Sequence, residues 1–184
     1  MTKTRSRRLR QYALISINGV ASTPLAWAGP YFGEGSVAHS LQALRECGGF
    51  LMGRRTYEIF AQQWPTAPGE YAAAMNAIPK IVFSNTLDSA TWHNTTIVRS
   101  DVISSVATMK AEAGLDLLVY GHGQFGQTLV DAGLVDELTL TVVPVFADGE
   151  PFFRRGSNNS SWELVRAGTG SDPGLAALTY RKAS

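Results

Sequence analysis

The glycines in VYGHGQFGQTLV, residues 119–130, have the spacing of a dinucleotide-binding loop. Gly121, Gly123 and Gly126 spell G-x-G-x-x-G after an apolar run and at the start of a segment with helical spacing. Glycines at such a junction let backbone N–H groups approach an anion closely. Asp148, 22 residues after Gly126, lies roughly where a Rossmann unit places its ribose-binding acid. The alternative is a glycine-rich turn that binds no ligand.

The segment MGRRTYE, residues 52–58, repeats this layout with cations added. Gly53 ends a short apolar run, and Arg54, Arg55 and Thr56 begin a segment with helical spacing. Guanidinium groups beside a helix N-terminus suit phosphate, because their paired donors match phosphate oxygens and the helix dipole adds to them. Polar residues also lie at the ends of two later predicted strands: Ser84, Asn85 and Arg99. Each of these residues taken alone is more simply explained as a turn or a cap.

The elements that must position these residues alternate between strand and helix over most of the chain. Branched and alternating residues predict strands at 12–19, 49–53, 80–84, 95–100, 116–120 and 136–146. Helical spacing predicts helices at 36–46 (with Ser36 as N-cap), 56–62, 69–77, 124–132, and from Val102 to a stop at Gly114. The tail, 162–182, has two runs around the turn TGSDPG, which predicts a hairpin. The pattern favours a mixed sheet with helices on its faces.

The late position of the glycine motif argues against a Rossmann domain. That fold carries its fingerprint in the first strand–helix turn, whereas four predicted strands precede the strand at 116–120 that leads into Gly121, and only 58 residues follow Gly126. A lone G-x-G-x-x-G is also a weak signal. Several polar strand ends can nevertheless meet at one edge of an open α/β sheet, where nucleotides bind. The two glycine-containing segments together therefore favour a nucleotide site.

Composition places the chain among ordinary soluble globular proteins. It has 184 residues, of which 45% are hydrophobic and 17% charged, and this length suits one domain. No apolar run approaches the ~20 residues that span a bilayer, so we expect no membrane association. The single cysteine, Cys47, suits a reducing compartment and predicts a cytoplasmic protein. His39, His93 and His122 are scattered without metal-ligand spacing, so we expect no metal.

The charge is unevenly distributed. Residues 1–10 hold five bases and no acid, which leaves 11 bases against 15 acids in the remainder. We expect a mobile basic arm over residues 1–10 and a single domain over 11–184. Such an arm can also recruit nucleic acid or anionic lipid. The acidic remainder offers no nucleic-acid surface, so we expect no nucleic-acid partner.

The sequence resembles the dihydrofolate reductase superfamily. The most similar branch is that of small bacterial proteins related to the C-terminal reductase domain of the bifunctional riboflavin-biosynthesis deaminase-reductase. The resemblance runs from about Arg10 to Lys182 and rests on five segments in order: SING, LMGRRTYE, MNAIPKIVFSNTL, LLVYGHGQFGQTL and GLVDELTLTVVPV. It implies a three-layer α/β/α fold with a mixed, mostly parallel sheet and a C-terminal antiparallel hairpin.

The resemblance also implies NADPH as the cofactor. In this superfamily the segments matching GRRT and SN grip the 2′-phosphate and pyrophosphate, and the glycine turn packs against the nicotinamide side. Asp148 then has no ribose role. Carried over by position, the implied cofactor-binding residues are Gly53, Arg54, Arg55, Thr56, Ser84, Asn85, Arg99, Tyr120, Gly121, Gly123 and Gln124.

Three positions depart from the pattern of the superfamily. Asn18 stands where an acid is common, and Asn85 stands where many members carry arginine. The loss of charge at Asn85 can be compensated by the other arginines, so we expect NADPH rather than NADH. His122 stands where glycine or serine is common. A histidine there could supply a proton near neutral pH, or it could point to solvent or donate to a carbonyl.

The long loop before the first predicted helix contains the candidate substrate-binding residues. Glu34 lies close to the position where dihydrofolate reductases hold the pterin with an acid, although a solvent-facing glutamate is the simpler explanation. Trp27, Tyr31 and Phe32 could stack on a flat heterocycle, or could pin the loop to the core.

The preferred hypothesis is an NADPH-dependent reductase that transfers a hydride to a small pteridine- or pyrimidine-like substrate. Its catalytic candidates are Asn18, Glu34 and His122. The alternative is a non-catalytic nucleotide- or ligand-binding module on the same fold. A third hypothesis is an assembly subunit that uses strand 136–146 and the tail hairpin, and a homodimer is compatible with all three.

Overall fold

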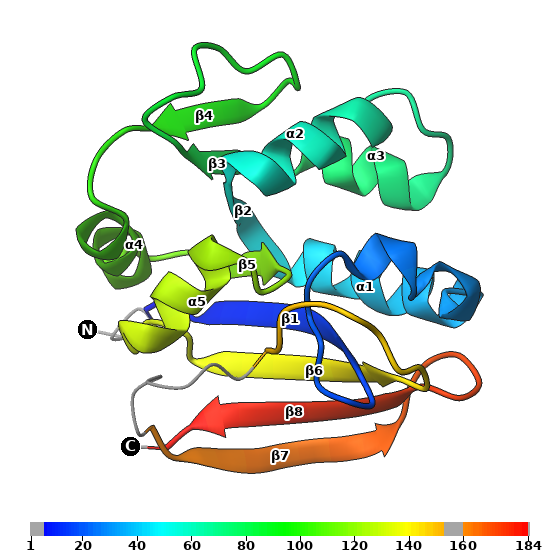
Figure 1. Cartoon of the computed structure of the whole chain (residues 1–184). Helices are drawn as coiled ribbons and strands as arrows, with labels where there is room; N and C mark the ends of the chain where they lie inside the picture. The colour runs from blue at the N-terminus through cyan, green and yellow to red at the C-terminus, as the bar shows by residue number, and fades with distance from the viewer. Residues whose placement is uncertain (1–5, 153–159, 184) are drawn as a thin grey trace.

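Eight strands form one twisted sheet in the part of the chain that the structure describes (Figure 1). A computed structural model describes residues 6–152 and 160–183. The strands in chain order are β1 Leu9–Ser16, β2 Cys47–Gly53, β3 Lys80–Phe83, β4 Thr95–Val98, β5 Asp116–Tyr120, β6 Glu137–Val143, β7 Trp162–Thr169 and β8 Ala176–Lys182. Their order in space is β4-β3-β2-β5-β1-β6-β8-β7.

The sheet is parallel except where the two C-terminal strands, β7 and β8, join it. All neighbours from β4 to β6 run parallel, whereas β8 runs antiparallel to both β6 and β7. This arrangement confirms the predicted mixed, mostly parallel sheet with an antiparallel hairpin. The glycine motif follows β5, the fifth strand of the chain and a central strand of the sheet, so the fold is not the Rossmann topology.

Helices cover both faces of the sheet. They are α1 Glu34–Glu46, α2 Arg54–Gln63, α3 Glu70–Ala77, α4 Val102–Ala111 and α5 Gln124–Asp131, and two 3₁₀ turns lie at Pro24–Ala26 and Gly29–Tyr31. Side chains of α1, α2 and α3 share one apolar cluster, while those of α4 and α5 share another. Figure 1 shows the two groups of helices on opposite sides of the sheet.

Strand β1 shows how the sequence builds two cores. Leu9, Ala13 and Ile15 alternate along the strand and pack into the cluster of α4 and α5. Tyr12 points to the other face and packs with the cluster of α1, α2 and α3. This period of two is what a strand buried on both faces requires.

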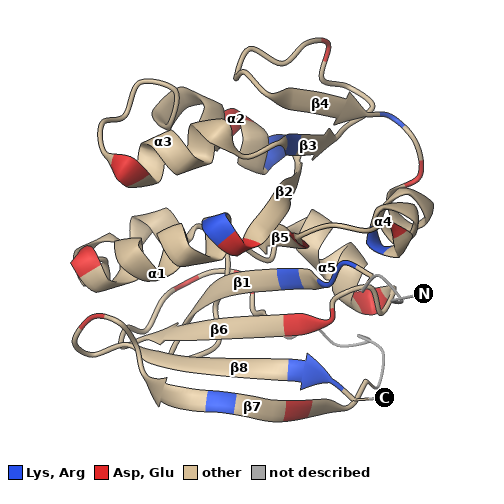
Figure 2. Ribbon diagram, turned by 180° about the vertical axis from the view of Figure 1, so that it is seen from behind, with Lys and Arg blue, Asp and Glu red and all other residues tan. Residues whose placement is uncertain are grey.

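The basic N-terminal segment joins the sheet earlier than predicted. Leu9 and Arg10 already belong to β1, and Leu9 is fully buried. The Arg8 guanidinium lies 2.9 Å from the Asp116 carboxylate, and that of Arg10 lies 3.2 Å from Glu137. Figure 2 shows the acidic start of β6 between the basic stretches of β1 and β8. The arm boundary at residue 10 is therefore wrong, because carboxylates hold these arginines; residues 1–5 lie outside the described residues.

The N-cap prediction for the first helix is also wrong. Helix α1 begins at Glu34, and its N-cap residue is Gly33 rather than Ser36. Instead the Asp172 carboxylate, in the turn between β7 and β8, accepts the backbone N–H groups of Gly33, Gly35 and Ser36 at 2.9, 3.0 and 2.8 Å. A negative charge at the positive end of the helix satisfies three donors at once, which one serine hydroxyl cannot do.

Two strands end earlier than predicted because the chain turns. Strand β1 ends at Ser16, whose hydroxyl accepts the N–H of Val20 at 2.9 Å and so closes a turn. Strand β6 ends at Val143, immediately before Pro144, which has no N–H to continue the ladder. The Val145 carbonyl then accepts the N–H of Ile17 at 2.9 Å. The loops after β1 and β6 therefore run together beyond the sheet.

Candidate functional site

The fold brings the two glycine-containing segments side by side at one edge of the sheet. Strands β2 and β5 are parallel neighbours, so the α2 start and the Gly121–Gly123 turn leave the same edge, here called the carboxyl edge. A Cβ built on Gly53 would lie 3.2 Å from the Phe125 Cβ. The Phe125 ring also stacks on that of Phe83, at the end of β3, with centroids 5.3 Å apart. Three strand ends therefore converge there.

The start of α2 presents cations with different partners. The Arg54 Nε donates to Glu58 at 2.6 Å, and its Nη1 donates to the Thr86 hydroxyl and carbonyl at 2.8 and 3.0 Å. Arg55 is exposed and makes no ion pair or hydrogen bond through its side chain within the described residues. Gly53 is the N-cap and brings no side-chain acceptor, while Thr56 is half-buried. Backbone donors at this N-terminus therefore lack a side-chain cap.

The turn after β3 is shaped by two of the predicted phosphate-binding residues. The Ser84 hydroxyl accepts the N–H groups of Thr86 and Leu87 at 3.2 and 3.0 Å. The Arg99 guanidinium donates to the Leu87 carbonyl at 2.7 Å and lies near those of Ser84 and Asp88. These contacts make Ser84 and Arg99 structural supports of the turn. Asn85 lies exposed at its tip.

Two of the three motif glycines are required, each for a different reason, and the third is not. Gly121 has a φ of +83°, which disfavours any side chain. Gly126 packs so closely on Gln11 that a Cβ would lie 2.6 Å from its Nε2. Gly123 is the N-cap of α5 and a Cβ there would meet nothing within 4 Å, so it faces open space. Gln124 begins α5 and is exposed.

Tyr120, by contrast, points into the core. Its ring lies 5.2 Å from that of Phe50 and 5.9 Å from that of Tyr12, and its hydroxyl donates to the Ser40 carbonyl of α1 at 3.2 Å. Burial raises the pKa of Tyr120 well above its usual value, so it stays a neutral donor. Tyr120 thus supports the glycine turn from beneath.

Two of the three predicted catalytic residues are engaged in structural contacts. Asn18 accepts the Ala147 N–H at 3.1 Å and donates to the Ala147 carbonyl at 2.9 Å. An acid could not donate to that carbonyl, which explains the amide at this position. His122 is half-buried and stacks on Phe152, with centroids 3.7 Å apart. Both of its ring nitrogens contact glutamine side chains.

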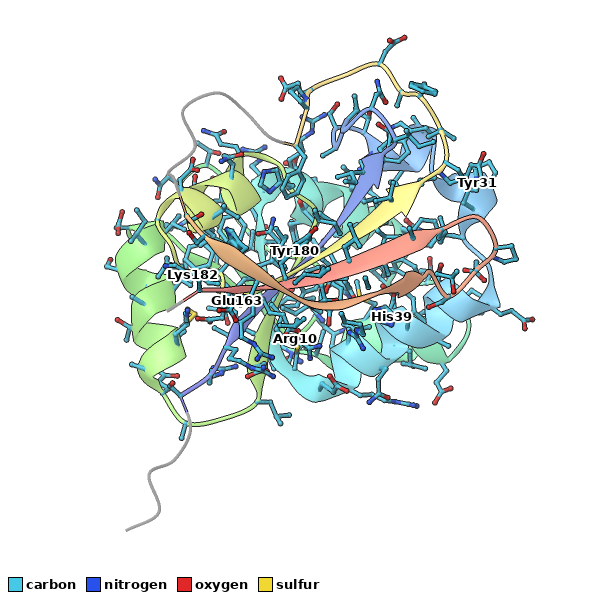
Figure 3. The ribbon with its side chains drawn as sticks, turned by 90° about the horizontal axis from the view of Figure 1, so that it is seen from below. Arg10, Tyr31, His39, Glu163, Tyr180 and Lys182 are labelled. Carbon is cyan, nitrogen blue, oxygen red and sulfur yellow. The ribbon has the colours of Figure 1, made fainter. Side chains whose placement is uncertain are left out.

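The loop aromatics and Glu34 lie on the α1 side of the carboxyl edge. Trp27 and Tyr31 pack on a small cluster with Val143 and Leu175, and the Trp27 Nε1 donates to the Ser22 carbonyl at 3.0 Å. Phe32 keeps 42% of its surface exposed. Tyr31 packs with Leu175, just before β8 begins, and in Figure 3 it lies at the opposite end of the molecule from Lys182, the last residue of β8.

Glu34 is exposed in the first turn of α1 and makes no side-chain hydrogen bond or ion pair within the described residues. It is thus the one predicted catalytic residue whose side chain is not engaged in the described structure.

Sequence reasoning missed three residues that organise this edge. Glu58, which pairs with Arg54, is four residues further along α2, and this spacing is visible in the sequence. Gln11 and Asp172 reach partners more than 100 residues away, and no local pattern marks them.

The described residues form a cavity away from this edge, but they include no metal-ligand cluster and no helix that could span a membrane. A cavity of about 520 Å³ lies at the opposite edge of the sheet, between Arg8, Asp136 and the end of β8. No group of three or more histidine, cysteine or acidic side chains that could hold a metal occurs within residues 6–152 and 160–183. Within the same ranges, no helix has the length and apolar character needed to cross a bilayer.

Comparison with known proteins agrees with this architecture. Residues 11–172 match the family described as RibD C-terminal domain. The chain is 24% identical over 143 residues to the uncharacterized protein YyaP of Bacillus subtilis (strain 168), an alignment covering 74% of this chain and 75% of that protein. The family match, over residues 11–172, includes both glycine-containing segments.

Solved structures share the fold. A Shewanella sp. PV-4 protein whose name assigns it to riboflavin biosynthesis superposes with a TM-score of 0.76 at 20% identity, covering 96% of this chain and 99% of that one. A pyrimidine reductase-like protein from Corynebacterium diphtheriae superposes with a TM-score of 0.62 at 15% identity, covering 97% and 92%. These likenesses confirm the predicted dihydrofolate reductase-like α/β fold.

Proposed function

This chain belongs to the family of RibD C-terminal domains, and from that premise we propose that it is an NADPH-dependent reductase of a small pteridine- or pyrimidine-like heterocycle. Family membership supports a reductase-type role. The name of the C. diphtheriae structure, a pyrimidine reductase-like protein, favours a nitrogen heterocycle as substrate. We further propose a cytoplasmic protein that works as a homodimer.

The observation that carries the proposal is the meeting of the α2 start with the glycine turn. Gly53 lies against Phe125 of α5, so one extended dinucleotide can reach both segments. The groups present fit a nucleotide phosphate. The α2 N-terminus has no side-chain cap, Arg55 has no carboxylate partner in the described residues, and Gly123 leaves open space.

We assign the coenzyme to two groups of residues. Arg55 and Arg54 would hold the 2′-phosphate, with Asn85 beside them and the α2 N-terminus on the pyrophosphate. The turn from Gly121 to Gly123 would face the nicotinamide half. When bound, the dihydronicotinamide supplies the hydride. The chain contributes orientation of both reactants.

The substrate would lie on the α1 side of the nicotinamide end. Trp27, Tyr31 and Phe32 offer aromatic surface for a flat ring, of which Phe32 is the most exposed of the three. Glu34, at the start of α1, would accept hydrogen bonds from ring nitrogens. Asn18 and His122 would act by holding loops in place, since their polar atoms already have partners.

The test begins with coenzyme binding. Thermal melts with NADPH and NADH should show a shift that is larger for NADPH, because a ligand at 100 times its Kd adds about 2.7 kcal/mol of stability. Dihydropterins, dihydrofolate and aminopyrimidines are then screened for their ability to oxidise bound NADPH. The oxidation is measured as the loss of dihydronicotinamide absorbance. If neither coenzyme raises the melting temperature, the protein is not the proposed reductase.

The side chains of Asn18 and His122 already have hydrogen-bond partners within the protein. This observation favours one alternative, a non-catalytic nucleotide-binding module on the same fold. That alternative predicts that NADPH shifts the melt while no heterocycle of the panel oxidises it. Glu34→Gln separates the two further. A reductase should lose turnover with little change in NADPH affinity, whereas a binding module has no turnover to lose.

A further inference from the structure

A chain of hydrogen bonds runs beneath the glycine turn and ends on its backbone. Gln11, on β1, is fully buried, and its Nε2 lies 2.8 Å from the Gly121 carbonyl oxygen and 3.0 Å from the His122 Nδ1. The His122 Nε2 lies 2.8 Å from the Gln127 Oε1. The Gln127 Nε2 then donates to the Asp131 carboxylate at 2.7 Å. Strand β1, the turn and helix α5 are thus joined by side chains.

The Asp131 carboxylate, at the end of this series of hydrogen bonds, fixes which group donates and which accepts in each of them. A carboxylate only accepts, so Gln127 must turn its Nε2 to Asp131 and its Oε1 to His122. That oxygen accepts, so the His122 Nε2 carries the ring proton and its Nδ1 is left as an acceptor. The two N–H groups of Gln11 are then used on the His122 Nδ1 and on the Gly121 carbonyl. Both ring nitrogens of His122 are occupied.

The orientation of the Gln11 amide carries a cost. Its Oε1 is buried and has no hydrogen-bond partner among the described residues, an arrangement that destabilises a folded protein. Turning the amide over would bring this oxygen onto the Gly121 carbonyl oxygen and place two acceptors in contact. The contacts to Gly121 and His122 therefore decide how the amide lies. Gly126 is part of the same device, because any side chain there would displace the Gln11 Nε2.

We infer that Gln11 is a positioning residue of the coenzyme site, acting through Gly121 and His122; this inference rests on the proposed function. In a trans peptide the carbonyl and the N–H point in opposite directions. Since the Gly121 carbonyl turns inward to Gln11, the N–H of the same peptide, on His122, points away from the core. Gln11 thus sets the turn in the orientation that the nicotinamide half meets, and His122 is a positioning residue rather than an acid.

Gln11→Met tests the inference, because methionine has a similar length but no donors. The dissociation constants of NADPH and NADH should both rise about tenfold, since the affected half is common to the two coenzymes. A purely structural role would lower the melting temperature without this equal loss. Gln127→Met is the matched control, because it breaks the chain beyond His122 and keeps the Gln11–Gly121 bond. We expect it to raise both constants only about twofold.

Nuclear magnetic resonance tests the arrangement without any nucleotide. At a pH where the ring is neutral, the nitrogen shifts of His122 should show only the Nε2–H tautomer, in the wild type and also in Gln127→Met, where Gln11 still donates to the Nδ1. In Gln11→Met the amide signals of Gly121 and Gly123 should move. If Gln11→Met does not fold, Gly126→Ala displaces the same side chain and should reproduce these changes.

Two results distinguish a failure of the inference about Gln11 from a failure of the proposed function. If the amide signals and both dissociation constants are unchanged in folded Gln11→Met or Gly126→Ala, the inference is wrong. If the wild-type protein binds neither coenzyme while the tautomer and amide signals behave as described, the proposed function fails. The hydrogen-bond chain then holds only the loop, and Gln11 is no coenzyme-positioning residue.

Discussion

The two edges of the parallel sheet use the same residue types in opposite ways. At the starts of β1 and β6, here called the amino edge, arginines meet carboxylates. Glu137 alone contacts Arg8, Arg10 and Arg181 at 3.5, 3.2 and 3.8 Å. At the carboxyl edge, one of three arginines has a carboxylate partner among the described residues, the Arg54–Glu58 pair. Arg99 donates to backbone carbonyls, and the Arg55 side chain is exposed.

This difference shows why a cavity lined by cations need not be the binding site. The cavity of about 520 Å³ at the amino edge is lined by Arg8, Arg181 and Lys182, but these cations already contact Glu137 or a carbonyl. At the carboxyl edge the positive charge is less neutralised, and helix N-termini add to it. An anionic coenzyme is therefore expected at the edge with fewer ion pairs.

The largest expected effect is on stability, at the amino edge. Glu137→Gln removes a charge whose side chain is 9% exposed and leaves the Arg10 guanidinium, 10% exposed, with Glu46, at 2.6 Å, as its remaining carboxylate partner among the described residues. Breaking a buried ion pair from one side costs about 3 kcal/mol, which urea unfolding would measure. Glu58→Gln, at the exposed pair of the carboxyl edge, is the control and should cost no more than about 0.5 kcal/mol. Equal losses in the two variants would contradict the comparison.

The next effect is on binding, at the carboxyl edge. Arg55→Ala should raise the Kd of NADPH about 30-fold, the equivalent of ~2 kcal/mol for a charged hydrogen bond, and that of NADH by no more than about threefold. Calorimetry or fluorescence titration measures both. Arg181→Ala, at the amino edge, should leave both values unchanged. A similar loss of affinity for NADH and NADPH would show that Arg55 does not bind the 2′-phosphate.

A smaller effect of opposite sign is expected at Glu58. Its carboxylate occupies the Arg54 Nε that a phosphate could use. Glu58→Gln should therefore lower the Kd of NADPH about threefold and leave that of NADH unchanged, in line with the modest energy of an exposed pair. The gain should shrink as salt is added, since screening weakens both the pair and the phosphate contact. Weaker NADPH binding in the variant would mean that Glu58 serves to orient Arg54.

The smallest effect concerns pH and the cap of α1. Hydrogen bonds from Ser36, and from the backbone of Gly33, lower the pKa of Asp172 below its usual 3.8. The stability contributed by this carboxylate is complete above pH 3.8 and is lost as the pH falls through the lowered value. Melting temperatures of wild type and Asp172→Asn should therefore differ at neutral pH and converge in acid. A constant difference down to the lowest pH at which both fold would contradict the assignment.

Local patterns were sufficient for much of the fold and for bringing the two segments of the candidate site together. The apolar runs and helical spacings predict most elements within a few residues, and parallel strands bring Arg55 and Gly121 to one edge by necessity. The glycine spacing predicts a tight turn, and Gly121 has the required positive φ. Roles of individual residues in binding stay predictions.

Contacts between distant segments could not be predicted in this way. A serine before a helical pattern is the local rule for a cap, yet Asp172, 136 residues beyond Ser36, takes that place. Gln11 lies just before the strand predicted at 12–19, and nothing in the sequence marks it until the fold puts the Gly121 carbonyl, 110 residues away, beside it. The amide at Asn18 is explained only by Ala147, which lies across the two loops.

The carboxylate that caps α1 has a consequence for how the chain matures on the ribosome. Helix α1 is translated well before the residue that neutralises its first turn, because Asp172 follows Ser36 by 136 residues and emerges just before β8, which pairs with β6. The aromatic loop next to that helix therefore lacks this anchor until residue 172 has been synthesised. A truncation before residue 172 should leave this loop protease-sensitive even where the central strands have formed.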